Sequence, residues 1–394
     1  MSPRSVEKKV ITADESSATR ERMPGIDALR AFAVTLTFVM HFAWLYAATF
    51  FNTDLESRHV ELSDTVERAI VTGQYYSLYG VYLFFMISGL LIGRRWVTPN
   101  QPRVIDYLAD RARRIFPAFW FSLAAAYALA VFRGITLPHS LVDVAANASL
   151  VNWFAPTLST PWLIVSWSLQ TEWIFYLCMP PIALGLTLLS PKNRSSALIC
   201  ITVIAMACLK ALGDRHFAYP LFFVIGISVA INPSNFRTIA QRLNMGFLAA
   251  LLLILHATYA CYAPIGAAKP AWQFGHYDLF VLAFAVVGGA IFIKMTFVPP
   301  TWLLARPILA LGRISYSFYL WHITILIALF EIVAKAPLAY QLQGWSWGLR
   351  WLLLFIICGG TSIVVSWLAF RLIEAPYFAS RLSKRRTLAH EKSL

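Results

Sequence analysis

An arginine and a histidine share one apolar segment, GIDALRAFAVTLTFVMHFAWLY (residues 25–46), which is long enough to cross a membrane. A charge at the centre of a membrane helix costs about 2.5–3.5 kcal/mol on insertion scales, so an ionisable residue there indicates a functional site. Arg30 and His41 are eleven residues apart, so in a helix they share one face, roughly 16 Å apart along the axis. Singly, Arg30 could extend to the interface and His41 could be a packing residue. Together they indicate a functional site. Asp27 is the expected ion partner of Arg30.

A second group of candidate residues lies in YLADRARRIFPAFW, residues 107–120. In a helix, Arg111 and Arg114 are neighbours on one face, whereas Arg113 points elsewhere. Two guanidinium groups on one face form a fork for phosphate oxygens. The alternative is that these arginines only anchor the segment to the cytoplasmic side of a membrane.

An acid, Glu172, lies within WSLQTEWIFY (residues 167–176), in another apolar window. A carboxylate at membrane depth needs a partner or stays protonated. The available cations are Arg30, Arg111 and His41. Structural ion pairing is the alternative to a role in chemistry.

Hydroxyl groups and a second imidazole occur in LGRISYSFYLWH, residues 311–322. Tyr316, Tyr319 and His322, with Ser315, would lie in the inner half of a membrane. Aromatic residues in such helices more often pack or anchor than bind a substrate. Ser88, in FFMISGLLIG (residues 84–93), precedes a glycine that allows close approach of another backbone.

The composition indicates which elements position these residues. The chain has 394 residues, 59% of them hydrophobic and only 13% charged, too little charge to cover a soluble globule of this size. We therefore predict an all-α polytopic membrane protein with about ten transmembrane helices. The windows of suitable length lie near residues 26–50, 75–92, 115–132, 161–189, 198–212, 216–232, 245–262, 277–294, 308–334 and 346–372.

The net charge of the chain is +14, and its Lys and Arg residues are distributed unevenly between the two sides of the predicted topology. With the N-terminus in the cytoplasm, the cytoplasmic segments hold 25 Lys and Arg residues and the outer segments hold 8, so both termini are expected inside. Nucleic acid is therefore not an expected partner. We divide the chain into a flexible cytoplasmic tail (1–24), a membrane domain (25–378) and a basic tail (379–394) that could contact membrane lipid. The five cysteines form no CxxC motif, so no metal site is expected.

Six segments, five of them described above, occur in an order that resembles the acyltransferase-3 family of integral membrane O-acyltransferases. They are DALRAFAVTLTFVMH, FFMISG, RARRIFP, WSLQTEWIFY, LGRISYSFYLWH and LIEAPYF, and they extend from about residue 24 to residue 380. The resemblance implies an enzyme of the bacterial cytoplasmic (inner) membrane. Such an enzyme takes an acyl group, usually acetyl, from cytoplasmic acyl-CoA and passes it to a sugar hydroxyl in a cell-envelope or exported glycan.

The family's site residues fall on Arg30 and His41, on Arg111 and Arg114, and on Glu172. His41 would then act as general base on the sugar hydroxyl or carry the acyl group covalently. The arginines would meet the phosphates of CoA, and Glu172 would orient His41 or hold an arginine. A departure is Leu90, where an aromatic residue usually follows the Ser-Gly pair, and the esterase-like domain that some relatives carry is expected to be absent.

Two other classes of protein fit parts of the pattern. A transporter, or a flippase for a lipid-linked sugar, also places ionisable groups at mid-membrane. Transporters tend to show paired halves with helices broken at corresponding places, and the sequence contains no such pairing. A purely structural protein would not need Arg30, His41 and Glu172 at that depth. The motifs specify neither the acceptor nor an oligomeric state.

Overall fold

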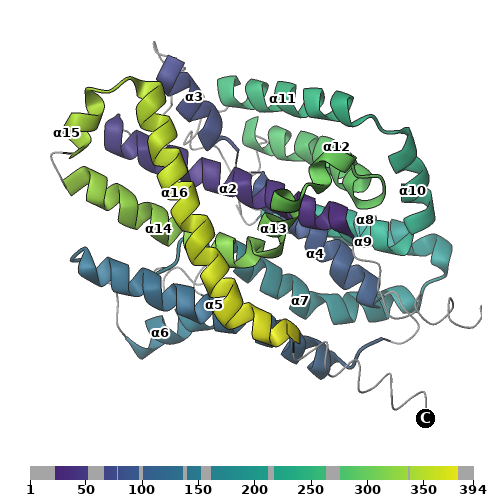
Figure 1. Ribbon diagram of the computed structural model, residues 1–394. Coiled ribbons are helices and arrows are strands. Elements are labelled where there is room, and N and C mark those ends of the chain that lie inside the picture. Colours follow the sequence, from purple (N-terminus) through teal and green to yellow (C-terminus); the bar gives the residue numbers. More distant parts are fainter. Residues whose placement is uncertain are drawn as a thin grey trace, which may run out of the picture.

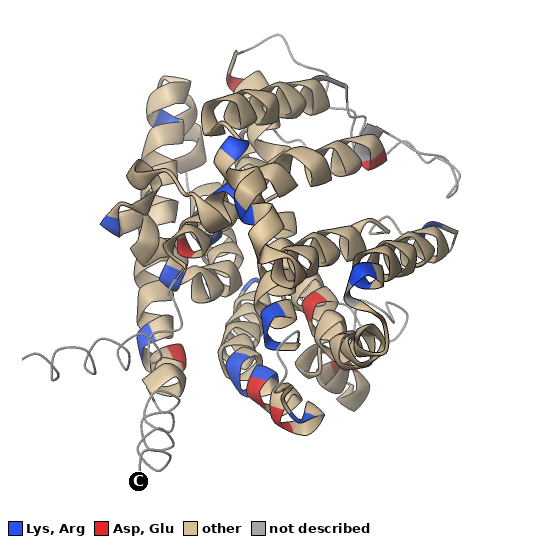
Figure 2. Cartoon of the chain, turned by 90° about the vertical axis from the view of Figure 1, so that its right-hand side faces the viewer, with Lys and Arg blue, Asp and Glu red and all other residues tan. Residues whose placement is uncertain are grey.

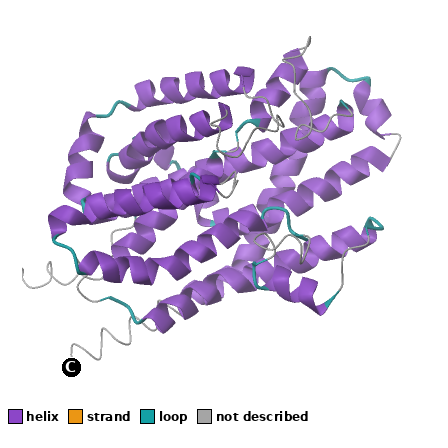
Figure 3. Cartoon of the chain, turned by 180° about the vertical axis from the view of Figure 1, so that it is seen from behind, coloured by secondary structure: helices purple, strands orange, loops and turns teal. Residues whose placement is uncertain are grey.

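The computed structural model describes residues 23–51, 66–77, 79–96, 101–135, 140–151, 161–211, 217–262, 276–335 and 338–379. Their regular elements are all helices, as predicted (Figures 1 and 3). The helices are α2 (Pro24–Phe50), α3 (Val66–Tyr75), α4 (Gly80–Trp96), α5 (Val104–Phe132), α6 (Leu141–Ala148), α7 (Ser166–Thr187), α8 (Pro191–Ala211), α9 (Tyr219–Ile231), α10 (Pro233–Arg242), α11 (Met245–Tyr262), α12 (His276–Phe297), η1 (Thr301–Leu304), α13 (Arg306–Arg313), α14 (Ser315–Lys335), α15 (Leu338–Gln343), α16 (Trp347–Ala369) and the π-helix η2 (Phe370–Glu374).

Every apolar window that the sequence predicts contains one of these helices. Within the described residues, seven helices are long and apolar enough to cross a membrane, or up to eight if α9 and α10, bent by 103°, form one span. The prediction of an all-helical protein is therefore confirmed, whereas the number of about ten spans stays a prediction. Residues 1–22 and 380–394, which make up most of the predicted tails, lie outside the described residues.

Helices satisfy their own backbone hydrogen bonds, which is why apolar segments of this length adopt them in lipid. Most of the helical ribbon consists of residues other than Lys, Arg, Asp and Glu (Figure 2). Pro24 lies at the start of α2, where its missing N–H costs nothing. Pro117 instead lies inside α5, directly after the turn that carries Arg113 and Arg114, and it removes one intrahelical hydrogen bond there.

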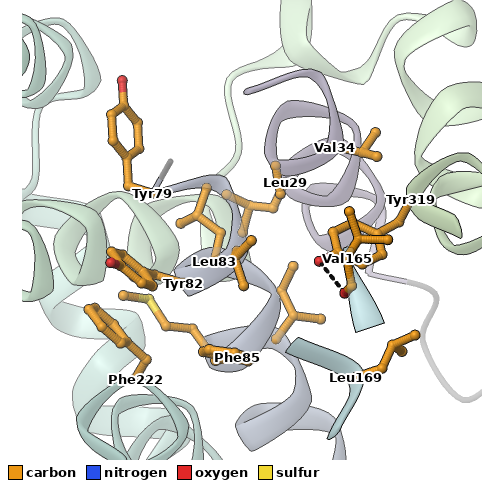
Figure 4. Close-up of a cluster of buried hydrophobic side chains, with 14 of the residues drawn as sticks. Leu29, Val34, Tyr79, Tyr82, Leu83, Phe85, Val165, Leu169, Phe222 and Tyr319 are labelled. Carbon is orange, nitrogen blue, oxygen red and sulfur yellow. Dashed lines mark hydrogen bonds between the residues drawn. The ribbon is translucent and has the colours of Figure 1, made fainter. Parts of the chain in front are cut away.

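Close backbone contact joins α4 to α9. A Cβ atom on Gly89 would lie 2.1 Å from the carbonyl oxygen of Phe223, and one on Gly226 would lie 2.1 Å from that of Met86. Glycine is therefore required at both positions, as in other closely packed membrane helices. The rings of Tyr82 and Phe222 stack beside this contact with centroids 4.5 Å apart (Figure 4).

Helix α2 runs through the centre of the bundle (Figure 1). It packs against α3, α4, α12, α13 and α14. Its N-terminal turn meets α13 so closely that a Cβ atom on Gly312 would lie 1.9 Å from the carbonyl oxygen of Asp27. The start of α2 and the end of α16 point toward the same side in Figure 1. Arg30 and His41 therefore lie on a central helix that several other helices surround.

Candidate active site

A cavity between the helices collects most of the residues that the sequence predicts for the site. Its space between atoms is about 670 Å³, including the part open to solvent. The lining comes from α2, α4, α5, α7 and α14, and it includes Arg30, Ser88, Arg111, Arg114, Ser168, Glu172, Tyr176, Ser315, Tyr316 and Tyr319 together with apolar side chains of α4 and α7.

Three arginines from two helices face this cavity. The Arg30 guanidinium lies 3.6 Å from Asp27, the ion partner that the sequence predicts. Arg111 is almost fully buried, and its Nη2 atom donates to Asp110 at 3.2 Å. Its Nε atom is buried without a hydrogen-bond partner. Arg114 makes no hydrogen bond or ion pair within the described residues. The described residues therefore pair the positive charge in this cavity only in part.

Glu172 lies on the same cavity and binds two hydroxyl groups. Its Oε1 atom accepts hydrogen bonds from Ser88 of α4 and from Tyr176, one turn later on α7. The Tyr176 ring in turn has the Arg111 guanidinium 5.8 Å from its centroid. The expectation that Glu172 orients His41 directly does not match this geometry, because Glu172 binds Ser88 and Tyr176, whereas the Nδ1 atom of His41 lies beside His322 and the Thr37 carbonyl oxygen.

His41 pairs with His322, from α14. The Nδ1 atom of His41 lies 3.0 Å from the Nε2 atom of His322 and 3.0 Å from the carbonyl oxygen of Thr37. The Nδ1 atom of His322 lies 3.0 Å from the carbonyl oxygen of Phe318. His322 is fully buried and His41 nearly so.

These contacts fix the tautomers of the neutral pair. A carbonyl oxygen only accepts, so Nδ1 carries the hydrogen in both rings and the Nε2 atom of His322 is an acceptor. His41 therefore donates from Nδ1 to an acceptor pair, His322 and the backbone, and its Nε2 lone pair has no hydrogen-bond partner among the described residues. This arrangement resembles the orientation of a catalytic imidazole by a hydrogen-bond acceptor behind it.

Tyr319 belongs to the cavity wall and also contacts the histidine pair. It lines the cavity, and its ring centroid is 5.8 Å from that of His322. Its hydroxyl group lies 2.5 Å from Ser168 Oγ and donates to the carbonyl oxygen of Val165 at 3.1 Å (Figure 4). Tyr316, one turn earlier on α14, also lines the cavity and donates to the carbonyl oxygen of Ile115 at 2.8 Å.

The structure thus places all ten predicted residues in one region. Seven of them line the cavity, Asp27 pairs with Arg30, and His41 and His322 bind each other next to Tyr319. Sequence reasoning did not assign site roles to Ser168, Tyr176 or Asp110. Ser168 and Tyr176 belong to the motif around Glu172, at i−4 and i+4, and helical periodicity could have identified them.

The model of the acyltransferase-3 family, described as an acyltransferase domain, matches residues 23–371, which is nearly the whole chain. The chain belongs to this family. The match confirms the resemblance on which the sequence-based prediction rested, and with the apolar helices it identifies an integral membrane acyltransferase.

Relatives of this acyltransferase include three bacterial proteins. The exopolysaccharide production protein ExoZ of Rhizobium meliloti (strain 1021) is 27% identical over 80% of this chain and 95% of its own. The putative membrane-bound transacylase BcsY of Komagataeibacter xylinus is 24% identical over 77% of this chain and 72% of its own. The O-acetyltransferase OatA of Staphylococcus aureus (strain NCTC 8325 / PS 47) is 23% identical over 77% of this chain and 51% of its own. No solved structure matches the chain.

Proposed function

We propose that this acyltransferase moves an acyl group, with acetyl as the first candidate, from cytoplasmic acyl-CoA to a sugar hydroxyl of a cell-envelope or exported glycan. The observation that carries the proposal is the cavity with three arginines beside the His41–His322 pair. The relatives ExoZ, an exopolysaccharide production protein, and OatA, an O-acetyltransferase, support the proposed acceptor and acyl group.

The partly paired arginines support a phosphate-bearing donor. A buried guanidinium nitrogen without a partner, such as Nε of Arg111, is costly at membrane depth unless a ligand completes its hydrogen bonds. Arg114 offers a second planar fork on the same face of α5. A CoA phosphate supplies the acceptor oxygens that both side chains lack, and the acyl arm then extends along the cavity toward Tyr319.

His41 acts as the general base in the proposed reaction. Its Nε2 atom accepts the proton of the sugar hydroxyl while the hydroxyl oxygen attacks the thioester carbonyl. The C–S bond breaks, and the imidazolium returns the proton to the sulfur of CoA. His322 accepts from Nδ1 throughout, which holds the ring in place and stabilises the charged intermediate state of His41. The net products are the acylated sugar and CoA thiol.

Purified protein in detergent or nanodiscs tests this function directly. Radiolabelled acetyl-CoA is supplied with a crude envelope glycan, and label in the glycan is counted with and without the protein. We expect label transfer that depends on both substrates. Movement of a glycan across a proteoliposome membrane, with no acyl chemistry, would overturn the proposal in favour of a transporter or flippase.

Arginine substitutions on α5 should separate donor binding from folding. We expect Arg111→Ala and Arg114→Ala each to weaken acyl-CoA binding about tenfold to a hundredfold, because a charge-assisted hydrogen bond contributes on the order of 1.5–3 kcal/mol. Isothermal titration with CoA measures the effect, and Arg113→Ala, at an exposed position between them, is the matched control. Equal behaviour of all three variants would mean that the arginines only anchor α5.

The cytoplasmic placement of the arginines is tested by labelling. Cysteines are introduced at Gln101, before α5, and at Leu141, after it, in a variant without native cysteines, because Cys178, Cys200 and Cys208 are exposed. A membrane-impermeant maleimide should label position 141 in intact spheroplasts and position 101 only after permeabilisation. The reverse pattern would move the arginines away from cytoplasmic CoA.

A further inference from the structure

The C-terminal end of the membrane domain packs on the turn of α5 that carries the arginines. Helix α16 passes into the π-helix η2 at Phe370–Glu374, and a further helical turn follows. π-helical turns are rare and occur often at functional sites. This segment contributes Glu374, Tyr377 and Phe378 to a small hollow that Arg113 and Arg114 also line.

The carboxylate of Asp110, immediately before Arg111, accepts hydrogen bonds from Arg95, Arg111 and Tyr377, which belong to three different parts of the chain. Its Oδ2 atom accepts from Arg95 of α4 at 2.7 Å and from Arg111 at 3.2 Å. Its Oδ1 atom accepts from the Tyr377 hydroxyl at 2.7 Å. Both oxygens of the carboxylate are therefore used, so the carboxylate cannot rotate without losing one of these bonds.

A carboxylate fixed in this way also fixes the guanidinium that it binds. Arg111 has several rotatable bonds, and its free side chain would populate many directions. Asp110 holds one terminal nitrogen of Arg111, while the Nε atom stays buried and unpaired. The planar group is thereby held with donors left over, as a preorganised anion site requires.

Glu374 keeps the C-terminal segment in this place. Its side chain is buried and accepts a hydrogen bond from Ser317 of α14, which is also fully buried. Ser317 follows Tyr316, a residue of the cavity wall. The segment therefore touches both walls of the site, α5 through Tyr377 and α14 through Glu374.

We propose that Asp110 and Tyr377 are positioning residues for donor binding: Tyr377 fixes the Asp110 carboxylate, and Asp110 directs Arg111 toward the CoA phosphate. The inference rests on the proposed function, because it takes the arginine ligand to be acyl-CoA. Neither residue lines the main cavity, so both act through Arg111 and not on the reacting atoms.

The test is Tyr377→Phe, which removes one hydroxyl group and keeps the ring. We expect the KM for acyl-CoA and the Kd for CoA to rise about threefold to tenfold, the range for loss of one hydrogen bond, while kcat changes less than twofold. Tyr340→Phe, the same chemical change at an 82% exposed position of α15, is the matched control. A Tyr377→Phe variant that loses only thermal stability, with the KM of the folded fraction unchanged, would overturn the proposal.

A double substitution shows whether Tyr377 acts through Arg111. In an Arg111→Ala background, Tyr377→Phe should add no further rise in KM, since the group that it positions is gone. An equal rise in both backgrounds would overturn the positioning role. Asp110→Asn, which keeps the shape and removes the charge, should follow the same pattern.

Measurements of CoA binding distinguish failure of the proposed function from failure of the positioning inference. If Arg111→Ala leaves CoA binding unchanged, the arginine is not a donor site, and the positioning inference falls with it. If Arg111→Ala weakens CoA binding but Tyr377→Phe and Asp110→Asn do not, only the positioning inference is overturned.

Discussion

His41→Gln is expected to reduce acyl transfer by about 10²–10⁴-fold, the usual contribution of a general base, while acyl-CoA still binds. Glutamine fills much of the same space and can form hydrogen bonds, but it cannot accept and return a proton at neutral pH. The Nε2 lone pair that the neutral pair leaves open on His41 is therefore the group that the substitution removes. Initial rates of acetyl transfer and CoA titration on the same preparation measure the two effects.

The control for His41→Gln is His256→Gln. His256 lies on α11, in an apolar helix of the same bundle, with its ring 5.8 Å from that of Tyr79. It lines no part of the main cavity, so its replacement should leave turnover near the wild-type value. Wild-type turnover in His41→Gln, or a loss of activity that only follows a loss of folded protein, would remove His41 from the mechanism. His322 would then be the next candidate for the base.

His322 should show its role through two contrasting substitutions. His322→Phe keeps an aromatic ring against Phe318, whose ring is stacked on the imidazole at 5.9 Å, but offers no acceptor to Nδ1 of His41. We expect a loss of kcat on the order of 10²-fold or more, because an imidazole without its orienting partner spends less time in the productive tautomer and direction. His322→Gln retains an acceptor oxygen and should recover part of this loss.

The comparison between these variants decides what the pair does. If His322 only packs, His322→Phe should be the milder change, since phenylalanine replaces the ring most closely. If His322 orients His41, the order is reversed and glutamine is milder. A second readout is the KM for acyl-CoA, which should stay near the wild-type value in both variants because neither touches the arginines of α5. A large rise in KM with normal kcat would place His322 in donor binding instead.

The amino-acid sequence predicts the helical membrane class because composition and hydropathy act over whole segments. Windows of apolar residues adopt helices in lipid wherever they occur, and each predicted window does contain a helix. Contacts within one helix can also be predicted from the sequence. The pair formed by Asp27 and Arg30, and the shared face of Arg111 and Arg114, follow from a period of 3.6 residues alone.

Partners on different helices were decided only by the tertiary structure. His41 and His322 are 281 residues apart, and the sequence offered Glu172 as an equally reasonable neighbour for His41. A helix that is apolar around most of its surface gives little indication of which face turns toward which neighbour. The rotation of α2 against α14, fixed by close packing along both helices, selects the imidazole pair and leaves Glu172 to Ser88 and Tyr176.

The same limit explains why Asp110 and Tyr377 were not predicted. Asp110 lies next to Arg111 in the sequence, and nothing in the sequence distinguishes it from the other charged residues of this basic segment. Its importance comes from Arg95 and Tyr377, which contact it from α4 and from the helical turn after η2. Local periodicity determines which residues share a face of one helix. The relative depth and rotation of separate helices determine which faces meet, and these depend on packing across the whole bundle.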